Sequence, residues 1–454
     1  MNAATILKFG GTSVNDAAAQ ERLAEIVRNQ MPARPVVVVS AIRGVTDALL
    51  QATTIARGGE VGRAFDTLQG QVGRYAGLAA ELLPPPMAEE VDSLVSSAAL
   101  EIADLLRIIS LHPGTFLPLQ DEIVSYGERL SSVLVARVLR SRGIPAEAVD
   151  ARRCILTDEE HTRATPLAGP TRERTRAELL PLVSRGVVPV LGGFIASAPS
   201  GATTTLGRGG SDYTGALVGA ALDAREIQIW TDVTGFLTAD PRVVPDARPL
   251  AHLSYSEAAE LAYFGAKVLH PKTIQPAVER SIPVRVCNSH RPEEPGTVVD
   301  ANEVVVPGVV KAIAHKPGVS IVHVASARML GAYGFMNAIF DIFSRHRTAV
   351  DVVSTSEVSV SLSLDDTHAL SRIVAELEQL GSVRVEGGFA IICLVGEGLR
   401  SSPGIAARVF GSLGDVDVAM ISQGASNINL TFVVHEEAVR PVVQRLHECC
   451  FGPA

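Results

Sequence analysis

A glycine-rich turn between an apolar run and a small-residue helix constrains the fold of this chain most strongly. Residues 203–214 read Thr-Thr-Thr-Leu-Gly-Arg-Gly-Gly-Ser-Asp-Tyr-Thr, between the strand-like run Val187–Ile195 and an alanine-rich helix predicted over Gly215–Asp223. Glycines permit a sharp turn close to a ligand, and the N-terminus of the following helix favours an anion. The turn lacks the Lys-Ser or Lys-Thr of a Walker A motif, and Asp212 replaces the third glycine of the dinucleotide fingerprint. An anion-binding turn and a purely structural turn are both open interpretations.

The composition narrows the class of protein. A chain of 454 residues predicts two or three domains, and its hydrophobic residues, 47% of the total with a single Trp, suit helices packed on a parallel sheet. The net charge of −9 argues against nucleic acid as the main partner. Five cysteines without CxxC spacing indicate reduced thiols rather than zinc ligands, and no apolar run reaches the length of a membrane span. We therefore expect a soluble, cytoplasmic protein.

Two further turns of small residues follow strand-like runs near the N-terminus. Lys8 lies in the apolar run Ala4–Phe9, which is followed by Gly10-Gly11-Thr12-Ser13. The uniformly apolar run Val36–Val39 is typical of a fully buried strand and is followed by Ser40-Ala41-Ile42-Arg43-Gly44-Val45-Thr46. In open α/β sheets, ligands bind outside the carboxyl ends of the strands. We therefore expect both turns and residues 207–212 in one cleft.

Helix-like and strand-like segments alternate over the rest of the first 300 residues. Helical spacing over residues 48–110 is broken at Pro84–Pro86 and resumes over residues 121–130, which places Glu128 on a helix. Strands are predicted over two more runs, Ala146–Val149 and Glu226–Thr231. The alternation predicts a mostly parallel sheet covered by helices on both faces. On pattern alone, Glu128 is typical of a solvated surface carboxylate.

Two later segments have the composition of binding loops. Thr231-Asp232 at a strand exit and the turn Ala239-Asp240-Pro241-Arg242 are typical of a ligand-binding loop rather than a plain connector. A helix that begins near Ser254 ends in Phe264-Gly265-Ala266-Lys267. Lys267 can bind phosphate or act as a solvated cation at the helix C-terminus, and both interpretations stay open.

The sequence repeats itself after a turn-rich segment at Arg291–Gly296. Gly334–Phe340 has the spacing of Gly404–Phe410, and Ser354–Leu362 aligns with Ser422–Leu430. Each unit is predicted to run strand, loop, helix, strand, strand, helix, which is a ferredoxin-like βαββαβ module. We expect a catalytic domain over residues 1–300 and a regulatory domain over 301–454. Its two modules cover about 312–382 and 383–454, and whether they interleave is left open.

Four motifs occur in the order found in aspartate kinases, and the chain resembles that family over nearly its whole length. They are Lys8-Phe9-Gly10-Gly11-Thr12-Ser13, Gly207-Arg208-Gly209-Gly210-Ser211-Asp212-Tyr213-Thr214, Trp230-Thr231-Asp232 and Phe264-Gly265-Ala266-Lys267. The resemblance, to the monofunctional, lysine-sensitive type, implies an amino-acid-kinase fold followed by two ACT modules. It implies transfer of the ATP γ-phosphate to the side-chain carboxylate of L-aspartate, giving 4-phospho-L-aspartate in the first step of lysine, threonine and methionine biosynthesis.

The chemistry of that reaction agrees with the residues. The side-chain pKa of aspartate is about 4, so the nucleophile is ionised at neutral pH and needs no general base. The difficulty is the repulsion between this anion and the polyphosphate. Cations, backbone N–H groups and Mg²⁺ held mainly through the phosphates should therefore carry catalysis. Lys8 and Lys267 supply two of the cations.

The resemblance also implies roles for individual residues. Lys8 would contact the transferring phosphoryl group, with Gly10 and Gly11 as backbone donors, and Asp212 would organise the lysines and the metal-bound phosphates. Arg208 is the implied clamp for the α-carboxylate of aspartate, and Glu128 the acceptor for its α-ammonium group. The implied lining of the substrate pocket is Ser40, Thr46, Phe194 and Ser211. The implied nucleotide-side positions are Thr231, Asp232, Arg242 and Lys267, while Leu237 stands where related enzymes can carry a Tyr. No residue is expected to ligate a metal directly.

The regulatory half resembles the effector site of lysine-inhibited members. The matching positions are Met329, Gly334, Phe335, Asp351, Thr355, Ser356, Glu357 and Val358. Asp351 and Glu357 are chemically suited to the ammonium groups of an effector. Lysine is the expected feedback inhibitor, with threonine, or lysine and threonine together, as the alternative. Pairing of such modules across a two-fold axis implies a homodimer or a larger oligomer.

Two other functions stay open. A kinase of the same fold that acts on another acid, such as glutamate or acetylglutamate, should lack the tandem tail and the placement of Arg208 and Glu128. A non-catalytic amino-acid sensor is disfavoured, because Lys8, Asp212 and Lys267 occur together.

Overall fold

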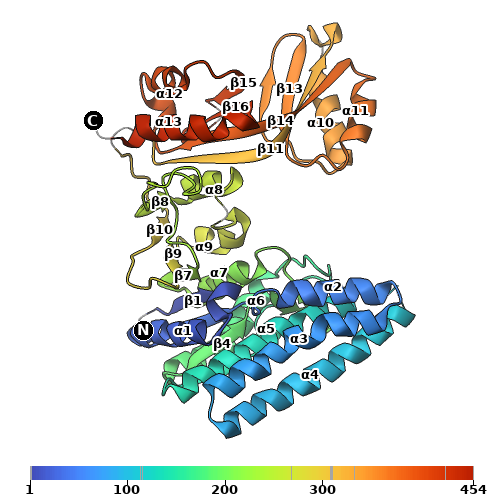
Figure 1. The fold of residues 1–454 in the computed structure, drawn as a ribbon, viewed down its shortest axis with the longest axis vertical. Coiled ribbons are helices and arrows are strands. Elements are labelled where there is room, and N and C mark those ends of the chain that lie inside the picture. Colours follow the sequence, from blue (N-terminus) through green and yellow to red (C-terminus); the bar gives the residue numbers. More distant parts are fainter. Residues whose placement is uncertain are drawn as a thin grey trace. The chain divides into compact units, whose positions relative to one another are not determined.

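The computed structural model describes residues 3–112, 114, 116–266, 268–306, 310–331, 333–424 and 426–452. Contacts divide the chain into two compact units, Met1–Gly235 with His270–Ala301 and Phe236–Leu269 with Asn302–Ala454. Figure 1 labels the elements of both.

A mostly parallel sheet forms the centre of the first unit, as predicted. Its strands run in the order β3-β4-β2-β1-β7-β9-β10, and neighbours are parallel except for β9 and β10. The strands are β1 (Thr5–Phe9), β2 (Pro35–Val39), β3 (Ala146–Val149), β4 (Val188–Gly192), β7 (Glu226–Thr231), β9 (Val284–Asn288) and β10 (Thr297–Asp300). A separate antiparallel pair is formed by β5 (Ile195–Ser197) and β6 (Thr203–Thr205). The carboxyl ends of β1, β2, β4 and β7 therefore meet at one edge.

Helices cover both faces of this sheet. They are α1 (Ala17–Gln30), α2 (Val45–Arg57), α3 (Val61–Leu82), α4 (Pro85–Leu111), α5 (Phe116–Ser141), α6 (Ala168–Ser184), α7 (Gly210–Leu222) and α9 (Gln275–Glu279). Side chains alternate along β1, so that Leu7 and Phe9 share a core with α1 and α5. Lys8 faces α7, where a Cβ at Gly215 would lie 3.5 Å from Lys8 Cβ. The alternation directs Lys8 away from the core that α1 and α5 share with the sheet.

The helices α2, α3, α4 and α5 share a second apolar core, and Figure 1 shows α2, α3 and α4 running side by side. The predicted break at the prolines is confirmed, since α3 ends at Leu82 and α4 begins at Pro85. A break that the pattern did not predict follows Arg57, where Gly58 ends α2.

Two boundaries near the glycine-rich turn differ from the prediction. The run Val187–Ile195 is not one strand, because Phe194 has a φ of 66° and separates β4 from β5. The helix α7 begins at Gly210 rather than Gly215, because Gly209, with a φ of 74°, ends the turn. Asp212 therefore lies in the first turn of α7.

A six-stranded antiparallel sheet in the order β12-β13-β11-β14-β16-β15 forms the centre of the second unit. Its strands are β11 (Ala312–Ala325), β12 (Val353–Thr355), β13 (Ser359–Leu364), β14 (Ser382–Val395), β15 (Val418–Gln423) and β16 (Asn429–His435). One core packs α10 (Phe335–Arg345) and α11 (Leu370–Leu377) on the sheet, and another packs α12 (Ile405–Leu413) and α13 (Val439–Phe451). The predicted pair of βαββαβ modules is confirmed.

The repeat seen in the sequence has a structural basis. Gly334 and Gly404, with φ values of 80° and 79°, occupy the same position immediately before α10 and α12. The long strands β11 and β14 serve both modules: Ala312–Lys316 pairs with residues 391–395 of β14, and Ile321–Ala325 pairs with residues 382–386.

Residues 236–269 were predicted to belong to the first domain, but they group with the second unit. This segment contains β8 (His252–Ser254) and α8 (Tyr255–Tyr263). Val243 and Val244 lie in the core that contains α13, and Thr238 Oγ1 lies 2.9 Å from His447 Nε2. These contacts group the segment with the C-terminal residues. The domain boundary at residue 300 stays a prediction. No helix in the described part of the chain is long and apolar enough to cross a membrane.

Candidate active site

A pocket of about 640 Å³ in the first unit lies where β1, β2 and β4 end and α7 begins. The glycine-rich turn and both turns of small residues contribute to its lining, as expected for parallel strands that end at one edge. It is lined by every predicted catalytic and substrate-binding residue, and by Gly11 from the predicted phosphate side: Lys8, Gly11, Ser40, Thr46, Glu128, Phe194, Arg208, Ser211 and Asp212.

Lys8 and Asp212 form an ion pair in this pocket. Lys8 Nζ lies 2.5 Å from Asp212 Oδ1, and the two side chains are 10% and 18% exposed. A Cβ at Gly10 would lie 3.7 Å from Lys8 Nζ, so the glycine leaves room beside the ammonium group. The Gly10 N–H donates to Trp230 O (3.1 Å), at the end of the neighbouring strand β7. The two predicted backbone donors therefore differ in position. Gly11 lines the pocket, whereas Gly10 lies beside Lys8.

The glycines of residues 207–210 are needed for close packing as well as for the turn. A Cβ at Gly210 would lie 2.6 Å from Phe194 Cδ2, and one at Gly209 would lie 2.7 Å from Thr273 Cγ2. The Phe194 N–H donates to Thr214 Oγ1 (2.9 Å), which fixes the Phe194 backbone against α7. The two interpretations of the turn are thus compatible, since a tightly packed turn also lines the pocket.

Glu128 is buried, contrary to its pattern-based interpretation as a surface carboxylate. A Cβ at Gly127 would lie 2.8 Å from Ala41 Cβ, and one at Gly192 would lie 2.8 Å from Glu128 O. These glycines let α5 approach the ends of β2 and β4, so that Glu128 is only 3% exposed. Burial raises the pKa of Glu128 to about 8, although a backbone hydrogen bond from Ala41 opposes the shift. Its Oε2 has no hydrogen-bond partner among the described residues.

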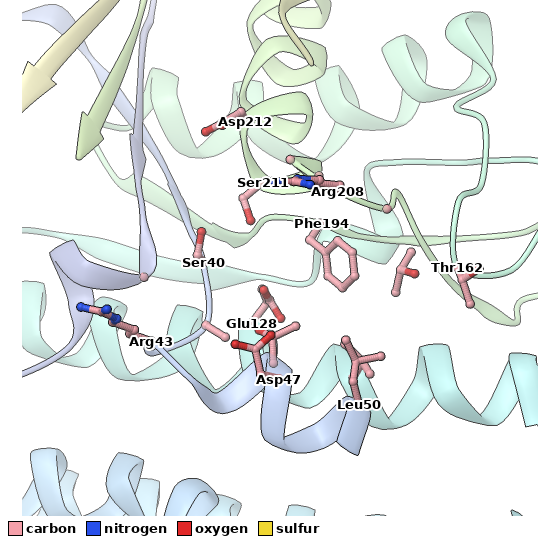
Figure 2. Close-up of a pocket in the computed structure, with 18 of the residues that line it drawn as sticks. Ser40, Arg43, Asp47, Leu50, Glu128, Thr162, Phe194, Arg208, Ser211 and Asp212 are labelled. Carbon is pink, nitrogen blue, oxygen red and sulfur yellow. The ribbon is translucent and has the colours of Figure 1, made fainter. Parts of the chain in front are cut away.

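Figure 2 shows how the pocket side chains are distributed. In this view Arg208 and Ser211 lie above the ring of Phe194, and Glu128 and Asp47 lie below it. A guanidinium group and a buried carboxyl group thus line one pocket, with Lys8 also on its wall. This arrangement suits a small zwitterion next to an anionic group.

Comparisons with known proteins agree with this geometry. A model of the amino acid kinase family matches residues 3–288, and an ACT domain model matches residues 392–449. Lysine-sensitive aspartokinase 3 of Escherichia coli is 40% identical over 460 residues, which cover 99% of this chain and 100% of that protein. The chain belongs to the aspartokinase family.

Solved aspartokinases also share its fold. Escherichia coli aspartokinase III in complex with aspartate and ADP matches with a TM-score of 0.82 at 38% identity, over 99% of this chain and 100% of that chain. The same enzyme in complex with lysine and aspartate matches with a TM-score of 0.82 at 37% identity, over 99% of each chain. The predicted family and fold of this aspartokinase are confirmed.

The four predicted nucleotide-side residues from Thr231 onwards are neither all in one unit nor all described. Thr231 and Asp232 end β7 in the first unit, with Thr231 Oγ1 3.2 Å from Asp232 Oδ1. Arg242 belongs to the second unit and pairs with Asp240 at 2.7 Å. Lys267 lies outside the described residues.

Several residues that line the pocket were missed from the sequence. They are Asp47, Leu50, Gln120, Asp121, Val124, Thr162 and Thr205, whereas Ala41–Gly44, Gly207, Gly209 and Gly210 lie in the turns expected to line one cleft. The spacing of Asp121 and Glu128, two helical turns apart on α5, is a signal that could have found Asp121.

The predicted effector residues of this aspartokinase lie in the first βαββαβ module. Asp351 differs from the rest, because its side chain is only 1% exposed and contacts Lys316 Nζ at 2.9 Å. The Tyr263 hydroxyl also donates to Asp351 Oδ1 (2.5 Å). Three neighbours, Thr355, Ser356 and Glu357, are exposed where β12 ends. The remaining ones are Met329 in a 3-10 helix (Ala327–Met329), Gly334 and Phe335 at the start of α10, and the exposed Val358.

Proposed function

We propose that this chain is an ATP-dependent aspartate kinase, which transfers the γ-phosphoryl group of ATP to the side-chain carboxylate of L-aspartate. The observation that carries the proposal is the buried Glu128 carboxyl group, without an ion-pair partner among the described residues, in one pocket with Arg208 and Lys8. An amino acid supplies the ammonium group that a buried carboxylate requires and a carboxylate that suits Arg208. An N-acetylated acid lacks the ammonium group and would leave Glu128 unpaired, which disfavours acetylglutamate.

The phosphate side of the reaction falls to Lys8, Gly11 and the N-terminus of α7. Lys8 would neutralise charge on the transferring phosphoryl group, and Asp212 would hold the ammonium group in place until the nucleotide binds. The carboxylate of aspartate attacks phosphorus, and ADP leaves with the electron pair of the broken P–O bond. No proton has to move, so the site needs no general base.

Mg²⁺ is expected to arrive with ATP. In the described part of the chain, no group of three or more His, Cys, Asp or Glu residues is placed to hold a metal ion. Mg²⁺ bound with a nucleotide is held largely by phosphates and water, and Asp212 would organise the metal-bound phosphates. The ion would supply charge neutralisation at the phosphates.

We also propose that the first βαββαβ module binds lysine as a feedback inhibitor. Asp351 already binds the ammonium group of Lys316, so its surroundings suit the ammonium group of an effector. An effector would have to displace Lys316, Tyr263 or both. Further support comes from the relatives, because Escherichia coli aspartokinase 3 is lysine-sensitive and aspartokinase III was solved with lysine. Assembly as a homodimer or larger oligomer through these modules, and a cytoplasmic location, complete the proposal.

The experiment that tests the reaction traps the acyl phosphate as its hydroxamate. With ATP and Mg²⁺, aspartate should give the hydroxamate, and glutamate and N-acetylglutamate should not. Lys8→Ala should lower kcat by about 10²–10³-fold, because it removes charge stabilisation in the transition state. The exposed Lys272, changed to Ala, is the matched control. Product from another acid but not from aspartate would refute the substrate, and near-normal turnover of Lys8→Ala would place the chemistry elsewhere.

A further inference from the structure

Three threonines fix the strand β6, which leads into the turn that carries Arg208. Thr205 Oγ1 donates to Asp121 Oδ1 (2.6 Å), and Thr203 Oγ1 donates to Glu122, the next residue on α5. Thr204 Oγ1, on the opposite face of the strand, lies 2.7 Å from Thr157 Oγ1. Two successive carboxylates of α5 thus hold the two ends of β6.

Asp121 also holds a second segment, the 158–165 loop. Its Oδ2 accepts hydrogen bonds from the Thr162 N–H (2.9 Å) and from His161 Nδ1 (2.9 Å). The residue is only 1% exposed. Burial raises the pKa of Asp121, although the bonds from Thr205, Thr162 and His161 oppose the shift. One buried carboxylate therefore joins three chain segments.

The 158–165 loop packs directly on the turn that carries Arg208. A Cβ at Gly207 would lie 3.3 Å from Thr162 O, and the Ala164 N–H donates to Thr205 O (2.9 Å). Thr162 also lines the pocket, and Figure 2 labels it together with Phe194 and Arg208. A displacement of the loop would therefore reach Gly207 and its neighbour Arg208.

Thr162 adopts a backbone conformation that is unfavourable for threonine. Its φ is 70°, in the left-handed region, which costs a β-branched residue about 1–3 kcal/mol. The bond from its N–H to Asp121 is one contact that stabilises this conformation.

We propose that Asp121 is a positioning residue for aspartate binding, which fixes β6 and the 158–165 loop so that Arg208 is held where the α-carboxylate of the substrate binds. Asp121 acts through Thr205 and Thr162 rather than on the reacting atoms. The inference rests on the proposed function, in which Arg208 is the clamp.

The test is Asp121→Asn, assayed with aspartate and ATP varied in turn. The amide keeps the shape of the side chain but has one acceptor oxygen instead of two, so it cannot accept both from Thr205 and from the pair Thr162 and His161. We expect KM for aspartate to rise about tenfold while kcat and KM for ATP change less than about twofold. Glu122→Gln is the matched control, because Glu122 bonds β6 but not the loop, and its KM for aspartate should change less than about twofold.

A rescue variant separates positioning from general stability. In the Asp121→Asn background, Thr162→Gly should restore most of the lost affinity for aspartate, because glycine adopts a φ of 70° without strain. A merely structural role for Asp121 would lower the melting temperature without splitting the two KM values, and Thr162→Gly would not rescue it. If Asp121→Asn does not fold, Thr205→Val removes one arm of the network, and the same selective rise in KM for aspartate is expected.

Equal changes in both KM values, or an unchanged KM for aspartate in either folded variant, would overturn the inference. Failure of the proposed function is distinguishable, because the unchanged enzyme would then form no aspartyl hydroxamate. If it phosphorylates a different amino acid, the same comparison of KM values is made with that acid.

Discussion

Glu128 and Asp351 are two buried carboxyl groups, and we assign an ammonium group of an amino acid to each. Glu128 has no ion pair among the described residues, and burial raises its pKa to about 8. Asp351 contacts Lys316 and Tyr263. Burial lowers the pKa of Lys316, but Asp365 and Asp351 more than offset this, so the pKa is raised and Lys316 stays charged. The first carboxyl group lacks a cation, and the second already has one.

The difference teaches how a substrate and an effector can be bound by similar groups with different consequences. Binding at Glu128 adds a missing cation, whereas binding at Asp351 exchanges one cation for another. Tyr263 is the last residue of α8, and the motif Phe264-Gly265-Ala266-Lys267 follows it. A Cβ at Gly265 would lie 2.2 Å from His315 O, beside Lys316 in the sequence. An exchange at Asp351 therefore changes the groups that hold the end of α8.

Of the changes that test this comparison, removal of the Glu128 carboxylate on the substrate side should have the largest effect. Glu128→Gln removes the carboxylate that would bind the α-ammonium group, and kcat/KM for aspartate should fall about 10²-fold at pH 8 with little change in KM for ATP. The raised pKa of Glu128 means that ionisation costs folding free energy as pH rises towards 8, so the variant should be at least as stable as the parent at pH 9. Thermal melts therefore provide the folding control. A normal kcat/KM for aspartate would remove Glu128 from the binding site.

The second effect is a pH dependence that only the substrate side should show. Glu128 is protonated in the free enzyme below its pKa of about 8, and the neutral acid binds an ammonium group weakly. As pH increases towards 8, kcat/KM for aspartate should rise about tenfold per pH unit, and above pH 8 it should level off. The profile of Glu128→Gln should lack this limb. A midpoint near the ordinary carboxyl value would contradict the burial argument.

The third and smallest expected effect concerns Lys316, the cation that pairs with Asp351 on the effector side. Lys316→Met removes the internal cation that competes for Asp351, so lysine should inhibit at a concentration about fivefold lower. Titration of lysine into the hydroxamate assay measures this. The control is Lys272→Ala, because Lys272 is exposed. Lys311→Met would be less suitable, because Lys311 pairs with the fully buried Glu257. An unchanged or weaker response to lysine would mean that Lys316 does not compete with the effector.

The residues that belong to a local sequence motif could be predicted from the sequence. The burial and the contacts that depend on distant segments could not. Lys8 and Asp212 were predicted because each belongs to a local motif, Lys8 shortly before Gly10-Gly11 and Asp212 shortly after Gly209-Gly210. The burial of Glu128 was not, because it depends on Gly192 and Ala41 from other segments. The partners of Asp351, 35 and 88 residues away in the chain, leave no local trace either. Phe194 interrupts a run whose apolar composition indicates a single strand, since its left-handed backbone is fixed by tertiary contacts.

The most direct test of this account is the number of protons released when aspartate binds at pH 7, measured by calorimetry in buffers of different ionisation enthalpy. With a pKa of about 8, Glu128 is about 90% protonated in the free enzyme at that pH, and an arriving ammonium group should ionise it. We expect release of about 0.9 proton per aspartate bound, and none in Glu128→Gln. No release in the parent, or the same release in both proteins, would contradict the claim that this carboxyl group awaits the ammonium group of the substrate.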